Sequence, residues 1–220
     1  EFIEVRHQLH ANPELSYEEY ETSRFIQEKL SAWQIPFEVK AKTGVVGLIK
    51  GKNPESRIIA LRADMDALPI MEENDVPYKS KNDGIMHACG HDGHTAMLLG
   101  AARYLAETRN FDGTAVVIFQ PAEEGGGGGR EMVADGMMER FGIQEVYGMH
   151  NMPGIPVGHF AIRPGAMMAA ADQFDITVTG KGGHAAKPHD CIDTTVVAAH
   201  IIVAAQTIAS RSVDPLKQVV

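Results

Sequence analysis

The chain has 220 residues, 44% of them hydrophobic, and a formal net charge of −9 at pH 7. This length allows one large domain or two smaller ones around a packed core. The negative charge argues against binding to nucleic acid or to an anionic membrane surface. The two cysteines, Cys89 and Cys191, lie far apart in dissimilar contexts. We therefore expect no disulfide framework and a reducing, cytoplasmic location.

The N-terminal part of the chain begins with two predicted helices and two predicted strands. Residues 2–10 carry apolar side chains at helical spacing and are followed by Asn-Pro, which predicts a short helix. Residues 16–19, Ser-Tyr-Glu-Glu, match a capping box that would open a second helix. Residues 44–49 and 58–63 predict strands, and the polar residues 72–83 predict a loop.

Helix and strand patterns go on alternating over the next part of the chain. Residues 95–107 predict a buried helix rich in small side chains, and residues 114–119 are a continuous apolar run typical of a buried parallel strand. Residues 130–138 predict a helix, and residues 145–149 predict a strand. This alternation indicates an α/β fold, a sheet covered by helices.

The pattern changes near residue 167. Residues 174–179 alternate apolar and polar side chains, which predicts a strand with one face in water. Asp193 would then cap a long helix that runs to Ser210. We expect a first domain over residues 1–168 and the beginning of a smaller α+β domain over residues 169–220.

The stretch His87-Ala-Cys-Gly-His-Asp-Gly-His94 holds three histidines, one cysteine and one aspartate in eight positions. These are ligand types for a divalent metal such as zinc. Cys89 and His91 would reach one ion from the same side of an extended segment, with Gly90 allowing a tight backbone. The helix that follows would favour a Cys89 thiolate. The alternative is that these histidines cap a helix or form ordinary core hydrogen bonds.

Acidic residues follow two of the predicted buried strands. Asp64 and Asp66 either orient a metal-bound imidazole or form a turn. Either one of Glu123 and Glu124 is a metal ligand and the other a general base, or both form a solvated acidic turn. The glycine run after them lacks the Gly-Lys-Ser/Thr ending of a nucleotide loop, so we expect it only to hold the two glutamates.

Two further histidines are candidates for the site. His150 follows the strand predicted over residues 145–149 and is either a ligand or a core histidine. His184 follows the alternating strand and lies between Lys181 and Lys187. It belongs either to a surface that meets an acidic group or to a solvated turn.

Together these segments resemble the dinuclear-metal amidohydrolases that include hippurate hydrolase, bacterial N-acyl-amino-acid amidohydrolases and plant indoleacetyl-amino-acid hydrolases. The resemblance covers nearly the whole chain, and its specificity comes from five motifs in the same order. They are Arg-Ala-Asp-Met-Asp-Ala-Leu-Pro at 62–69, His-Ala-Cys-Gly-His-Asp-Gly-His at 87–94, Gln-Pro-Ala-Glu-Glu-Gly-Gly at 120–126, Met-His-Asn at 149–151 and Gly-Gly-His-Ala at 182–185.

The resemblance implies two divalent metal ions, zinc or manganese. Cys89 would bridge them, and His91, Glu124 and His150 would be further ligands. Glu123 would be the general base that shuttles the proton.

Two aspartates and a histidine complete the implied site. Asp66 would support the ligands from outside the metal shell, and Asp64 stands where distant relatives carry a ligand histidine. His184 would reach the scissile carbonyl across a dimer interface, where it would stabilise the oxyanion.

The implied architecture is a zinc-peptidase-like catalytic domain, with a mixed sheet flanked by helices, and the start of a ferredoxin-like lid or dimerisation domain. The implied reaction is hydrolysis of a small N-acyl amino acid by a homodimer or larger homo-oligomer. Relatives of this family continue further and add one more metal-binding histidine, so we expect either a fragment of a longer enzyme or a truncated product with impaired activity. A dipeptidase or aminopeptidase of the same fold, or a non-catalytic binding protein, is the alternative.

Overall fold

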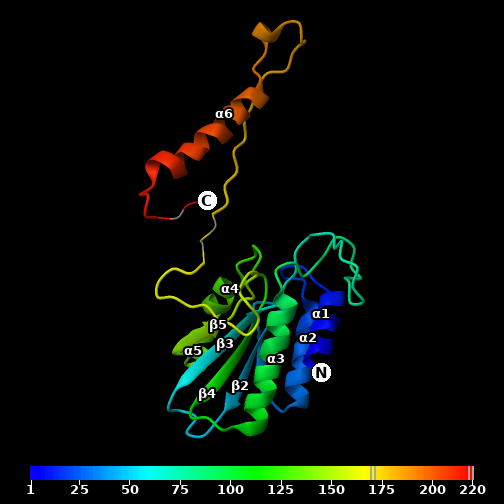
Figure 1. Cartoon of the computed structure of the whole chain (residues 1–220), viewed down its shortest axis with the longest axis vertical. Helices are drawn as coiled ribbons and strands as arrows, with labels where there is room; N and C mark the ends of the chain where they lie inside the picture. Colours follow the sequence, from blue (N-terminus) through cyan, green and yellow to red (C-terminus); the bar gives the residue numbers. More distant parts are fainter. Residues whose placement is uncertain (169, 171, 218, 220) are drawn as a thin grey trace. The chain divides into compact units, whose positions relative to one another are not determined.

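The structure is a computed structural model that describes residues 1–168, 170, 172–217 and 219. It divides into two compact units, Glu1–Gly158 and His159–Val220, which are described separately (Figure 1). The assignment of residues 1–168 and 169–220 to a catalytic and a lid domain stays a prediction.

In the described part of the first unit, five strands form one mixed sheet in the order β1-β2-β4-β3-β5. The β1–β2 and β2–β4 pairs are antiparallel, whereas β3 runs parallel to both β4 and β5. The bounds are β1 Phe37–Lys40, β2 Gly44–Lys50, β3 Ile58–Asp64, β4 Thr114–Gln120 and β5 Glu145–Gly148. The predicted mixed sheet is confirmed, although β1 was not predicted.

Helices cover both faces of this sheet (Figure 1). Alternate side chains of the central strand β4 point to opposite faces, so Val117 and Phe119 join one apolar cluster and Val116 and Ile118 join the other. The first cluster packs under α1 Phe2–Ala11, α2 Tyr20–Ala32 and α3 His91–Thr108, and the second under α4 Gly128–Ala134 and α5 Met137–Phe141.

The strand directions determine where the polar segments meet. Asp64, at the end of β3, lies in register with Gln120, at the end of the parallel strand β4. The parallel strand β5 ends at Gly148, close before His150. Because the carboxyl ends of parallel strands lie at one edge of a sheet, the residues that follow them gather there.

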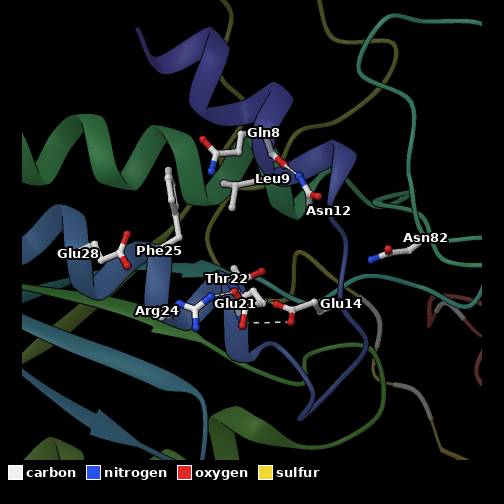
Figure 2. A pocket seen from close by; sticks show the side chains of 10 residues that line it. All are labelled: Gln8, Leu9, Asn12, Glu14, Glu21, Thr22, Arg24, Phe25, Glu28 and Asn82. Carbon is white, nitrogen blue, oxygen red and sulfur yellow. Dashed lines mark hydrogen bonds and ion pairs between the residues drawn. The ribbon is translucent and has the colours of Figure 1, made fainter.

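The second helix begins differently from the expected capping box. Helix α2 starts at Tyr20, and the carboxylate of Glu14 accepts the backbone N–H groups of Glu21 at 3.0 Å and Thr22 at 2.8 Å. Figure 2 shows Glu14 beside this first turn, in a groove between α1 and α2 that holds none of the metal-ligand candidates. The Ser16 hydroxyl is not free to cap α2, because it donates to Asp66.

The helix expected over residues 130–138 is interrupted. Helix α4 ends at Ala134, and Gly136, with φ +73°, turns the chain into α5. Glycine is suited to this left-handed conformation, which a longer side chain would strain.

The second unit contains α6, Thr194–Thr207, between short helical turns at Pro188–Asp190 and Ile208–Ser212. Asp193 caps α6 as predicted, accepting the N–H groups of Thr195 and Val196. The strand expected over residues 174–179 does not form, because no described strand pairs with it and an unpaired strand leaves its backbone groups unsatisfied. In the part of the chain that the structure describes, no helix is both long and apolar enough to cross a membrane.

Candidate metal centre

Potential ligand atoms converge at the carboxyl edge of the sheet. Three overlapping groups each bring their donor atoms within 4.8 Å of one another, and His91 belongs to all three. The groups are Cys89 with His91 and His150, Asp64 with His91 and His94, and His91 with Glu123 and Glu124. The four predicted ligands and the predicted general base thus lie together.

His91 is the first residue of α3 and is fully buried. Its Nδ1 donates to the backbone carbonyl of Asp66 at 2.9 Å, so the lone pair lies on Nε2. Nε2 lies 3.6 Å from a carboxylate oxygen of Asp64, 3.9 Å from one of Glu123 and 3.8 Å from one of Glu124. Burial alone would lower the pKa of His91, but the surrounding carboxylates, first those of Asp66 and Asp64, raise it.

His150 is arranged in the same way, whereas His94 is not. His150 Nδ1 donates to the carbonyl of Asn151 at 2.6 Å, and its Nε2 lies 3.4 Å from Cys89 Sγ. His94 Nδ1 lies 2.6 Å from Asp64 Oδ1, and its Nε2 accepts the Asn151 N–H at 3.0 Å. Both nitrogens of His94 are therefore used, while His91 and His150 each keep a lone pair for a ligand.

Cys89 and His91 approach each other by a turn and not by an extended segment. Gly90 has φ +92°, and a Cβ there would lie 2.4 Å from Asn151 Oδ1, so both conformation and space require glycine. The expected stabilisation of a Cys89 thiolate by the helix end is outweighed by the surroundings of the sulfur. Burial raises the pKa of Cys89 to about 11, and the nearby carboxylates of Glu124 and Glu123 add to this effect.

Asp64 and Asp66 are buried, and neither forms the turn given as the alternative, because Asp64 ends β3 and Asp66 lies outside any turn. Asp66 Oδ2 accepts the Ser16 hydroxyl at 2.8 Å and the Glu124 N–H at 3.0 Å. Burial alone would raise the pKa of Asp66, but the His91 ring, whose Nδ1 lies 3.3 Å from Oδ1, and the hydrogen bonds to Oδ2 lower it to about 2. This carboxylate therefore contacts both the histidine and the glutamate segments of the cluster.

Glu123 and Glu124 differ in exposure, which is 41% for the Glu123 side chain and 20% for that of Glu124. Burial raises the pKa of Glu124, and the neighbouring Glu123 carboxylate raises it further against the opposing effect of His91. The chain after them is tightly packed where α4 begins, as a Cβ on Gly128 would lie 1.9 Å from the Pro121 carbonyl oxygen.

The cluster has the chemistry of a cation site. Two of its buried polar atoms, His91 Nε2 and Glu124 Oε1, have no hydrogen-bond partner among the described residues. A divalent ion would satisfy these donors together with the Cys89 sulfur. His87, from the same sequence stretch, belongs to none of the three groups, and burial lowers its pKa to about 4.

His184 is exposed in the second unit. Its Nδ1 accepts the N–H of Ala186 at 3.1 Å, so the neutral ring carries its proton on Nε2. Its expected role at the scissile carbonyl stays a prediction.

Sequence reasoning did not connect His10 or Glu19 with the site: His10 received no role, and Glu19 was expected only as part of the capping box. His10 lies between Asp92 and Glu72, 82 and 62 residues away, at 2.9 and 3.0 Å. Glu19 is fully buried and accepts the N–H of Ala122. Their partners are too distant in sequence for any local pattern to reveal them.

Comparison with known proteins agrees with this geometry. Residues 60–218, more than half of the chain, match the model of the family described as Peptidase family M20/M25/M40. Hippurate hydrolase of Campylobacter jejuni is 49% identical over 98% of the chain and 56% of its own length. N-acetyl-L-cysteine deacetylase of Bacillus subtilis is 48% identical over 100% of the chain and 53% of its own length.

A solved structure supports the same assignment. The YXEP protein of Bacillus subtilis, described as a dinuclear metal binding peptidase from the M20 family, matches with a TM-score of 0.68 and 46% identity, over 71% of this chain and 44% of its own. The chain spans about half the length of the curated relatives it matches. The predicted resemblance and fold class are confirmed, and the chain belongs to the peptidase family M20/M25/M40.

Proposed function

We propose that this chain carries the metal centre of an amidohydrolase that converts small N-acyl amino acids into a carboxylic acid and a free amino acid. The observation that carries this proposal is the pair of Nε2 lone pairs on His91 and His150, gathered with Cys89 and Glu124 beside the more exposed Glu123. The names of the relatives, a hippurate hydrolase and an N-acetyl-L-cysteine deacetylase, support the substrate class.

Two divalent ions would be held by Cys89, His91, Glu124 and His150, in keeping with the description of the Bacillus subtilis YXEP protein as dinuclear. The sulfur ligand favours zinc, with manganese as the alternative. When bound, the ions would supply Lewis acidity that polarises the amide carbonyl and makes water more acidic.

The side chains of this chain would do the rest. Glu123, exposed on the open side of the cluster, would take a proton from the attacking water and deliver it to the leaving amine nitrogen. Asp66 would orient His91 and Glu124, since it contacts both segments. His184 from a partner copy would donate its Nε2–H to the developing oxyanion. Homodimerisation and a cytoplasmic location stay predictions.

The decisive experiment compares Glu123→Gln with Glu124→Gln in the full chain. We expect Glu123→Gln to keep its metal content and to lose about 10²- to 10⁴-fold in kcat on benzoylglycine, because only the proton acceptor is removed. Glu124→Gln should lose metal as well as activity, because a ligand is removed. Elemental analysis and single-substrate kinetics measure both.

The matched control is Glu55→Gln, which neutralises an exposed carboxylate before the start of β3, at the opposite end of that strand from Asp64, and should change neither quantity. Near-normal turnover of metal-loaded Glu123→Gln would contradict the mechanism. Preference for an unblocked dipeptide over benzoylglycine would favour a dipeptidase, and binding of benzoylglycine by the metal-loaded wild type without hydrolysis would indicate a binding protein.

A further inference from the structure

The segment Ser16–Glu19, between α1 and α2, contains a carboxylate that is fully enclosed. Glu19 has no exposed surface. Its Oε1 accepts the backbone N–H of Ala122 at 2.8 Å, and its Oε2 accepts the hydroxyl of Thr43 at 2.7 Å. Both partners are uncharged. Enclosing a carboxyl group with such partners costs free energy, and an apolar side chain at this position would stabilise the fold more. Stability alone therefore does not explain the carboxyl group.

The residue that Glu19 holds is strained and stands directly before the two site glutamates. Ala122 has φ +49°, in the left-handed region where the Cβ of a non-glycine residue is strained against the backbone. Such backbone conformations persist only where surrounding contacts enforce them, and they gather at functional sites. The hydrogen bond from the Ala122 N–H to Glu19 is such a contact.

The same segment also holds the chain beyond the two glutamates. The Tyr17 hydroxyl donates to the Gly126 carbonyl at 2.9 Å. A Cβ on Gly126 would lie 2.7 Å from the Tyr17 ring and 2.6 Å from Ala122 Cβ, so only glycine leaves room for these two side chains. Tyr17 itself has φ +62°. The residues on both sides of Glu123 and Glu124 are therefore held by one short segment.

A third contact connects this segment to the other acidic strand end. The Ser16 hydroxyl donates to Asp66 Oδ2, the same oxygen that accepts the Glu124 N–H. The N-terminal segment thus touches the loop of the glutamates at Ala122 and Gly126 and reaches its Glu124 amide through one shared carboxylate oxygen.

We propose that Glu19 is a positioning residue which, through the Ala122 amide, sets where Glu123 and Glu124 point into the metal centre. This inference rests on the proposed function, in which Glu124 is a ligand and Glu123 the general base. Glu19 does not touch the ligand cluster; it acts through the backbone that carries both side chains.

The test measures zinc affinity and kinetics of the full chain with three variants. Glu19→Ala removes the acceptor of the Ala122 N–H, and we expect its zinc affinity to fall about 10- to 100-fold, as is usual when a residue that supports a metal ligand is lost. Its kcat on benzoylglycine should fall while KM changes little. Glu19→Gln should restore both quantities to within about threefold, because an amide can accept from Ala122 and donate to Thr43.

Thr43→Val is the matched structural control, because it removes the other buried hydrogen bond of Glu19 and leaves the Ala122 contact in place. We expect it to lower the melting temperature and to leave zinc affinity unchanged. Zinc affinity is measured by competition with a chromophoric chelator, on samples shown to be folded by circular dichroism. This readout does not depend on the choice of substrate.

The results separate the two proposals. A folded Glu19→Ala variant with wild-type zinc affinity and kcat would overturn the positioning role and leave the metal centre standing. The same would follow if Thr43→Val weakened zinc binding as much as Glu19→Ala does, or if Glu19→Gln restored nothing. A wild-type chain that binds no zinc or manganese would overturn the proposed function itself.

Discussion

At the scale of single residues, one histidine connects the buried carboxylates that lie next to the ligand cluster. His10 lies between the carboxylates of Asp92 and Glu72, and Arg6 also contacts Asp92 at 3.0 Å. The hydrogen bond to Asp92 raises the pKa of His10; burial opposes this, and Glu72 adds to it. Since Asp92 follows His91 in the first turn of α3, these ion pairs also anchor the ligand segment.

The sign of this shift predicts a pH dependence. Because the pKa of His10 is higher in the fold, the protonated ring stabilises the fold fully at pH values below the ordinary histidine pKa of about 6.5. This stabilisation is lost as the pH rises through the pKa that His10 has in the fold. We expect His10→Gln to cost about 1.5–3 kcal/mol at pH 6, the range for hydrogen bonds to charged groups, and clearly less at pH 9.

Urea unfolding at the two pH values measures this difference. His200→Gln, which alters an exposed histidine on α6, is the control and should show no such pH-dependent loss. An equal cost of His10→Gln at pH 6 and pH 9 would show that the ring is not charged in the fold.

At the scale of elements, the glycines divide into those the fold requires and those it only tolerates. Gly100 lies inside α3, and a Cβ there would make ordinary contacts of 3.6 Å with the Phe2 ring. Gly113, just before β4, has φ +95°, and a Cβ there would lie 2.2 Å from the Arg57 carbonyl oxygen. The same substitution should therefore have opposite effects at the two sites.

We expect Gly100→Ala to raise the free energy of unfolding by about 0.5–1 kcal/mol, because alanine loses less backbone freedom than glycine in a helix. Gly113→Ala should lower it by at least that much through backbone strain. Equilibrium urea unfolding of both variants tests the pair. A destabilised Gly100→Ala would mean that α3 packs more tightly against α1 than the contact distance indicates.

At the scale of the whole molecule, all of the proposed metal ligands lie in the first unit, Glu1–Gly158. An ion that binds only the folded state stabilises it by about 2.7 kcal/mol at a free concentration one hundred times its Kd. Zinc should therefore raise the melting temperature of the first unit, and a chelator should reverse the change.

Hydrogen exchange followed by mass spectrometry shows where the stabilisation falls. We expect zinc to slow exchange in the peptides around Asp66, Cys89, Glu124 and His150, with the α6 peptides of the second unit as the internal reference. Slower exchange confined to α6 would contradict the proposed centre.

Much of this protein could be predicted from local patterns. Helical spacing of apolar residues in α1 and α3 and apolar runs in β2, β3 and β4 correctly identified these elements, because burial of one face imposes a period on the sequence itself. Acidic and ligand residues directly after strands also pointed to one edge of the sheet. Parallel strands bring their ends together whatever the intervening sequence.

The failures share one physical cause. The capping box at Ser16 was wrong because the hydroxyl has a partner 50 residues away, and the strand over 174–179 was wrong because alternation cannot supply a neighbouring strand. The Cys89 thiolate was expected from the helix end alone, whereas burial, together with the carboxylates of Glu124 and Glu123 that follow β4, raises the pKa of this thiol.

The sequence by itself determined the order of the elements, the family and the set of side chains that gather at the sheet edge, since these depend on residue types and local periods. Only the tertiary structure decided which histidines keep a free Nε2 and which carboxylate holds the Ala122 amide. Hydrogen-bond direction and burial depend on atoms that lie far apart in the chain and come together only when the fold closes.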